Sequence, residues 1–105
     1  MSEIDSAQRR ADFHAQTARI PFRELQRYFA GGHLVLVGKA LDLVDVAVAL
    51  AEDDKARFEA WIGDDSVGPV SDDQARTWLT DDAELWAVVA NPWVLVQELV
   101  RKPSQ

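Results

Sequence analysis

The chain has 105 residues, which is close to the usual size of a single domain. Its hydrophobic fraction of 48% and charged fraction of 28% are typical of a globular protein and argue against global disorder. The net charge of −7 argues against a nucleic-acid binder, because phosphate contacts need clustered Lys and Arg. Without cysteine, the chain has neither a disulfide framework nor a thiolate nucleophile.

The charge is distributed unevenly along the chain. Residues 1–39 carry six basic and four acidic groups, whereas residues 40–100 carry three basic and fourteen acidic groups. An anion would therefore be attracted to the N-terminal third. The first twenty residues contain no apolar core of a signal peptide, and no apolar run approaches the ~18–20 residues that span a bilayer. We therefore expect a cytoplasmic protein that does not bind membranes.

The N-terminal third predicts two helices and a strand. Small apolar residues recur every three or four positions in residues 4–18, which indicates a helix with a weak apolar face. Pro21 suits the first position of a second helix, which Gly31-Gly32 would end. The apolar run Leu34–Val37 then predicts a short buried strand.

The middle of the chain predicts the central helix of the fold. In residues 41–52 the polar residues form only a narrow stripe, so most of this helix should be buried. Asp53-Asp54 can cap a further helix that carries Phe58, Trp61 and Ile62 on its apolar face.

The C-terminal part predicts three strands and one helix. Val67–Val70 contains Gly-Pro, which is typical of an edge strand, and Ser71 begins a capping-box pattern for a helix. Leu85–Ala90 and Trp93–Gln97 are apolar and read as strands on either side of Asn91-Pro92. Whether they form a hairpin or one bent strand stays open, because Asn-Pro is not a favoured hairpin turn.

Together these elements predict one α+β domain over residues 1–105. Four or five helices pack on a small, mostly antiparallel, three- to four-stranded sheet, with residues 1–10 and 101–105 flexible. Apolar C-terminal strands would promote aggregation at an open edge, and a homodimer that covers them is one solution. In that case, substitution of Val94 and Val96 by Lys would weaken dimerisation.

Four Asp-Asp pairs are the most conspicuous polar motif, at residues 53–54, 64–65, 72–73 and 81–82. Clustered carboxylates can bind Mg²⁺ or Ca²⁺, but a pair at a helix start also caps free N–H groups. We favour capping at helix starts for all four pairs. Asp81 and Glu84 look like a further capping box.

Neither histidine belongs to a recognisable metal motif. His14 and His33 have no second His or Glu at metal-binding spacing, so a surface or junction role is favoured for each. No Gly-x-Ser-x-Gly elbow or phosphate-binding glycine loop is present. We therefore predict no catalytic residues, no metal ligands and no cofactor.

Tryptophans provide the remaining functional signal. Trp61 and Trp78 lie on predicted core faces, whereas Trp93 follows a proline at a bend, where a large ring can be half exposed. An exposed tryptophan beside Arg19 or Arg23 would form a pocket for an anion or a partner protein. The predicted binding residues are Thr17, Arg19, Arg23, His33 and Trp93.

Several segments, taken together, resemble a known family. They are Gln16–Pro21, Leu41–Val44, Asp53-Asp54 with Trp61, Gln74-Ala75 with Trp78, Leu85–Val89 and Pro92–Gln97. The chain is similar, from about Ala11 to Gln97, to a family of small bacterial proteins that carries the description domain of unknown function 2288. The resemblance implies a complete single-domain bacterial protein, and it brings no activity, cofactor or catalytic residue.

Two functional hypotheses from different classes follow. The first is a non-enzymatic binding or interaction module that recognises a protein or a small anion through the Thr17–Arg27 region and nearby aromatic residues. The second is a small metal-dependent enzyme of the hydrolase type that uses the Asp pairs with His33. The sequence does not name a ligand, a strand order or an oligomeric state.

Overall fold

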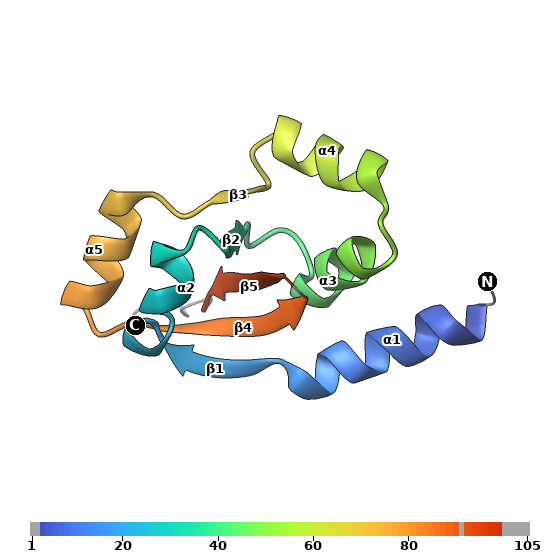
Figure 1. The fold of residues 1–105 in the computed structure, drawn as a ribbon, viewed down its shortest axis with the longest axis horizontal. Helices are drawn as coiled ribbons and strands as arrows, with labels where there is room; N and C mark the ends of the chain where they lie inside the picture. The colour runs from blue at the N-terminus through green and yellow to red at the C-terminus, as the bar shows by residue number, and fades with distance from the viewer. Residues whose placement is uncertain (1–2, 91, 100–105) are drawn as a thin grey trace, which may run out of the picture.

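The computed structural model describes residues 3–90 and 92–99, with side chains described from residue 7 onward. Figure 1 shows helices packed around one twisted sheet. The helices are α1 (Glu3–Gln16), η1 (Phe22–Glu24, a 3-10 helix), α2 (Gln26–Ala30), α3 (Leu43–Ala51), α4 (Lys55–Gly63) and α5 (Asp72–Thr80). The strands are β1 (Ala18–Pro21), β2 (Leu34–Val37), β3 (Val67–Pro69), β4 (Glu84–Ala90) and β5 (Trp93–Glu98).

The sheet has five strands in the order β1-β4-β5-β2-β3. β4 and β5 pair antiparallel from Ala90 and Trp93 onward, so the two apolar C-terminal segments form a hairpin. β5 and β2 pair in parallel, whereas β1–β4 and β2–β3 are antiparallel. The predicted α+β class is confirmed, but the sheet is mixed and has five strands, where the sequence predicted three to four.

The unpredicted strand is β1, which lies where the first helix was expected to continue to Ala18. α1 ends at Gln16, and Thr17 still donates its backbone N–H to the Phe13 carbonyl at 3.0 Å. β1 then runs beside β4, and Pro21 precedes the 3-10 helix rather than starting an α-helix. The segment Ala-Arg-Ile-Pro has no apolar run like that of β2, so only its pairing with β4 reveals the strand.

Helices cover both faces of the sheet, and each face has its own buried cluster. One cluster joins η1 and α5 to the sheet through Phe22, Leu25, Val70, Ala75, Trp78, Leu34, Leu85, Ala87, Val94 and Val96, with Tyr28 and Phe29 of α2 packed against it. The other joins α3 to the sheet through Leu43, Val46, Ala47, Val35, Val37, Val67, Val88, Ala90 and Leu95, with Phe13 of α1 and Trp61 of α4 packed against it. α3 is therefore the buried central helix that the sequence predicted.

The Asp pairs lie at helix ends as well as helix starts, which corrects the prediction. Asp54 and Asp72-Asp73 do begin α4 and α5. Asp53, Asp65 and Asp82, in contrast, follow α3, α4 and α5 with positive φ angles of 58°, 65° and 51°. Aspartate is one of the few residues other than glycine that adopts this left-handed conformation, so the two roles look alike in sequence.

Two further local predictions fail at these helices. Asp81 is the C-cap of α5 and Glu84 is the first residue of β4, so they do not form a capping box. Ile62 is 48% exposed, although it was expected on the apolar face of its helix, and Leu79 of α5 is 45% exposed. The helices α4 and α5 are short and pack through fewer apolar positions than the periodicity indicated.

The C-terminal strands lie in the interior of the sheet, not at an open edge. Val94 and Val96 are 4% and 0% exposed, so Lys at either position would disrupt the core instead of testing an interface. The edges are β1 and β3, which are short and end in Pro21 and Pro69, and both features protect an edge from further pairing. The argument for a homodimer from an exposed apolar edge is therefore wrong, and dimerisation itself stays a prediction.

α1 begins at Glu3, so residues 3–10, which were expected to be flexible, belong to a helix. Residues 101–105 lie outside the described part of the chain, and the flexibility expected of both termini stays a prediction. Within residues 3–90 and 92–99, none of the helices has the length and apolar character that crossing a membrane requires.

Candidate functional site

The five predicted binding residues lie in three separate places. Arg23 forms an ion pair with Asp82 at the end of α5. The His33 ring lies edge-on to Trp93, with 6.2 Å between ring centroids, and Trp93 is 36% exposed at the start of β5. Thr17 and Arg19 lie at the junction between α1 and β1.

Arg19 does lie beside an exposed tryptophan, but this residue is Trp86 and not Trp93. Arg19 is paired with Trp86 across β1 and β4, and Trp86 is paired with Gln97 across β4 and β5. Directly paired residues point to the same face, so these three side chains form one row across the sheet. The Arg19 guanidinium lies 5.9 Å from the Trp86 ring centroid, and 38% of Trp86 is exposed.

Trp86 forms one wall of a groove of about 520 Å³, which we call the Trp86 groove. It is lined by His14, Thr17, Ala40, Leu41, Asp42, Leu43, Val44, Trp86 and Gln97. These residues come from the end of α1, the loop before α3, the start of α3, and strands β4 and β5. The groove lies on the sheet face that α3 covers, at the N-terminal end of that helix.

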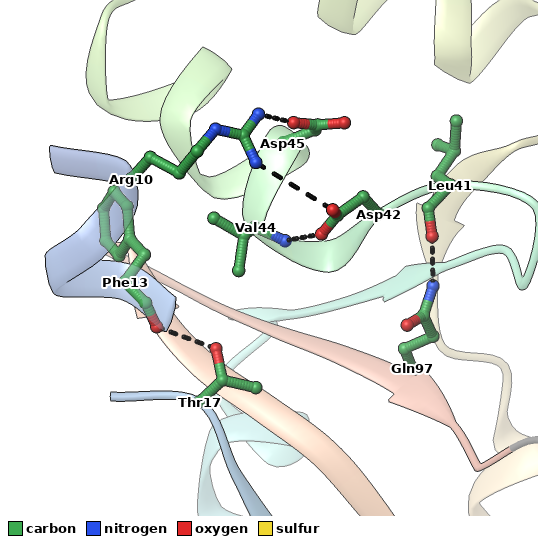
Figure 2. Close-up of polar contacts among 8 residues, drawn as sticks. All are labelled: Arg10, Phe13, Thr17, Leu41, Asp42, Val44, Asp45 and Gln97. Atoms are coloured by element: carbon green, nitrogen blue, oxygen red, sulfur yellow. Dashed lines mark hydrogen bonds and ion pairs between the residues drawn. The ribbon is translucent and has the colours of Figure 1, made fainter. Parts of the chain in front are cut away.

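Gln97 holds the loop that forms one side of the groove. Its side-chain amide donates to the Gly38 carbonyl at 2.9 Å and to the Leu41 carbonyl at 2.7 Å. Figure 2 shows the second of these bonds, with the amide oxygen of Gln97 turned away from Leu41. Both N–H groups of the amide are therefore used to fix residues 38–41 on β5.

Asp42 forms the adjoining part of the wall as the N-cap of α3. Its Oδ1 accepts a hydrogen bond from the Val44 backbone N–H at 2.9 Å. Arg10 of α1 lies 3.9 Å from Oδ2 of Asp42 and also pairs with Asp45 in the first turn of α3 (Figure 2). This carboxylate therefore stays in place at the rim, although 56% of its side chain is exposed.

The end of α1 closes the opposite side. The Thr17 hydroxyl donates to the Phe13 carbonyl at 2.8 Å, which satisfies a carbonyl in the last turn of the helix (Figure 2). α1 is held to α3 by the ion pairs of Arg10 and by Arg9, which lies 3.3 Å from Glu52. This wall is thus attached mainly by surface ion pairs, with Phe13 as its half-buried apolar contact.

A larger groove of about 710 Å³ lies on the other face, between α5, β1, β4 and β5, and includes Arg23 in its wall. Its central acid is Glu98, which accepts hydrogen bonds from Trp78 Nε1 at 3.1 Å and Gln74 Nε2 at 3.3 Å, and lies 3.8 Å from Lys39. Arg23 is paired with Asp82. These polar groups are paired with one another, so their role is to stabilise the fold. We therefore take the Trp86 groove as the candidate site.

The metal-dependent alternative receives no structural support. Among the side chains that the structure describes, in residues 7–90 and 92–99, no three or more His, Asp or Glu lie together as potential ligands of a metal ion. His33 contacts Trp93, and the Asp pairs are distributed among the ends of different helices.

Sequence reasoning missed Trp86, Gln97 and Asp42 as groove residues. Trp86 and Gln97 read as parts of apolar strands, and Asp42 as part of the thin polar stripe of a buried helix. A signal for the site was present in Arg19, but its neighbour depends on the β1–β4 register, which the sequence does not show locally.

These features define a small α+β domain with a five-stranded mixed sheet and an open groove at one end of its central helix. The chain belongs to the family described as "Protein of unknown function (DUF2288)", which matches residues 8–98. The family resemblance is therefore confirmed over nearly the whole chain.

One solved structure shows the same fold. The chain is 40% identical to PA1075 from Pseudomonas aeruginosa, whose solution structure was determined by NMR, with a TM-score of 0.78. The match covers 100% of this chain and 96% of that one. No curated protein matches the chain.

Proposed function

We propose that the protein is a non-enzymatic binding module and that the Trp86 groove is its ligand site. The observation that carries the proposal is the exposure of Trp86. A tryptophan on the second strand of a five-stranded sheet is 38% exposed, on a face where α3 buries Val88 and Leu95 almost completely. A ligand that covers the indole would bury apolar surface that the fold itself leaves in water.

The dimensions and lining of the groove support this role. Its volume of about 520 Å³ falls within the range of roughly 300–1,000 Å³ that is common for small-molecule sites. It combines apolar walls from Leu41, Leu43 and Val44 with a few fixed polar groups, which is the usual composition of such a site.

The first test measures what the protein retains from its host. Native mass spectrometry of gently purified protein, together with affinity capture, should show a bound molecule or partner that Trp86→Ala loses. The control is Leu79→Ala, which removes an apolar side chain of similar exposure from α5. Retention by Trp86→Ala at the wild-type level would contradict the proposal.

Substitutions at Arg19 and Arg23 distinguish the Trp86 groove from the larger groove by experiment. Arg19 lies against Trp86, whereas Arg23 is paired with Asp82 and lines the larger groove. Arg19→Glu reverses the charge beside Trp86 and should therefore change capture by roughly tenfold, which corresponds to about 1.4 kcal/mol, and Arg23→Glu should not. An equal change in both variants would indicate a general effect of charge and would count against the Trp86 groove.

A further inference from the structure

Gln97 and Thr17, two polar residues of the Trp86 groove, use their side-chain donors within the protein. Gln97 directs both amide hydrogens to the carbonyls of Gly38 and Leu41, and Thr17 directs its hydroxyl hydrogen to Phe13. An amide also has a carbonyl oxygen, and a hydroxyl has two lone pairs. These side chains can therefore offer a ligand only hydrogen-bond acceptors.

Asp42 adds a third acceptor and a negative charge. Its Oδ1 caps α3, and its Oδ2 lies 3.9 Å from Arg10, which is beyond hydrogen-bond distance. An ionised carboxylate has about four lone-pair positions, so it can still accept from a ligand at the rim. His14 and the indole N–H of Trp86 are the side chains of the lining that can donate.

The Trp86 ring provides a flat surface beside these acceptors. Arg19 already places its guanidinium near this ring, and Arg19 is not part of the groove lining, whereas Gln97 is. The groove therefore lies on the Gln97 side of the indole. A planar cation on an indole face gains a cation–π contact in addition to apolar contact.

We propose that the Trp86 groove binds a planar ligand that carries N–H donors, of the amidinium or guanidinium type. The flat π-system would lie on Trp86, and its N–H groups would point to Gln97 Oε1, the Thr17 hydroxyl oxygen and the Asp42 carboxylate. This inference rests on the proposed binding function and specifies the chemistry of the ligand. It opposes the expectation of a small anion, because an anion would face acceptors and a carboxylate.

Three probes of one shape test the polarity of the groove. Benzamidine offers only donors and a positive charge at neutral pH, benzamide offers both donors and acceptors, and benzoate offers only acceptors and a negative charge. In ¹⁵N-labelled protein, the indole N–H of Trp86 and the side-chain amide of Gln97 should shift with benzamidine at the lowest concentration. Affinity should fall at least tenfold from benzamidine to benzoate, with benzamide between them.

Asp42 allows a substitution that removes its charge and keeps its capping role. Asparagine caps a helix about as well as aspartate, so Asp42→Asn should fold normally. It should weaken benzamidine about fivefold to tenfold and leave benzamide unchanged. Asp54→Asn is the matched control, because Asp54 is the N-cap of α4 and lies outside this groove.

Three results would overturn the inference. They are tighter binding of benzoate than of benzamidine, no shift of Trp86 or Gln97 with any probe, and an equal effect of Asp42→Asn and Asp54→Asn. Tight benzoate binding at Trp86 would leave the proposed binding function intact and reverse only the ligand class. The capture experiment with Trp86→Ala tests that function independently of these probes.

A free small molecule and an arginine of a partner protein share this chemistry. Agmatine and an acetylated arginine amide distinguish them, since both carry a guanidinium but only the second has peptide groups. Tighter binding of agmatine would indicate a small-molecule ligand, and tighter binding of the arginine amide would indicate a peptide. Either result supports the inference, and binding of neither would contradict it.

Discussion

Two tryptophans on opposite faces of the sheet show the difference between a packed and an open site. Trp78 of α5 is 3% exposed, its ring centroid lies 5.3 Å from that of Phe22, and its N–H donates to Glu98. Trp86 of β4 is 38% exposed and lies next to Arg19. Each residue lines a groove, but only the groove of Trp86 leaves a large aromatic surface open.

This difference teaches that groove size alone does not identify a ligand site. The larger groove contains more charged residues, yet Glu98 is engaged by Trp78, Gln74 and Lys39. These side chains pair with one another and thereby stabilise the fold. The smaller groove has an uncovered indole and spare acceptors, which are features that a ligand can use.

The largest expected effect contrasts the two tryptophans directly. Trp78→Ala should lower the free energy of unfolding by about 3–5 kcal/mol, because it leaves a cavity beside Phe22. Trp86→Ala should lower it by less, about 1–2 kcal/mol, because 38% of the residue is already exposed to water. Urea denaturation followed by far-UV circular dichroism measures both values. Similar losses would remove the distinction between a structural and a binding tryptophan.

A medium effect is expected at Glu98. Glu98→Ala should cost about 1–3 kcal/mol, since it leaves the Trp78 N–H without its acceptor in a partly buried position. Glu98→Gln should cost less, because its carbonyl oxygen can still accept. Glu84→Ala is the control, an exposed acid in the same groove. If Glu98→Ala were no more destabilising than Glu84→Ala, the larger groove would not depend on this acid for stability.

The smallest effect concerns the wall that α1 provides for the Trp86 groove. Arg10→Ala should cost about 0.2–1 kcal/mol, the usual contribution of a surface ion pair. Amide hydrogen exchange should increase in α1 but not in α5. Arg76→Ala, which removes the exposed pair with Asp73 on α5, should leave α1 exchange unchanged. Unaltered protection of α1 in Arg10→Ala would show that the ion pairs of Arg10 are not needed to hold this wall.

Most individual elements could be predicted because their signals are local. The apolar run of β2, the thin polar stripe of α3 and the Ser71 cap of α5 are visible within a few residues, and the structure contains all three. The Gly-Pro segment that predicted an edge strand is β3 at one edge. The candidate site was predicted only in part, through Thr17 and Arg19.

The remaining features depend on contacts between distant segments. Asp54 and Asp65 have the same side chain, yet one begins a helix and the other follows one in a left-handed conformation. The two roles use the same short polar side chain, so local sequence does not separate them.

The sequence by itself therefore determined the α+β class and the position of the central helix, because these follow from apolar periodicity along the chain. Only the tertiary structure decided the β1–β4 pairing, the parallel β2–β5 pair and the row of Arg19, Trp86 and Gln97. Strand pairing joins residues far apart in sequence, and its register is selected by packing against both helical layers. The Trp86 groove lies at the N-terminal end of α3, where the packing of this helix on the sheet ends.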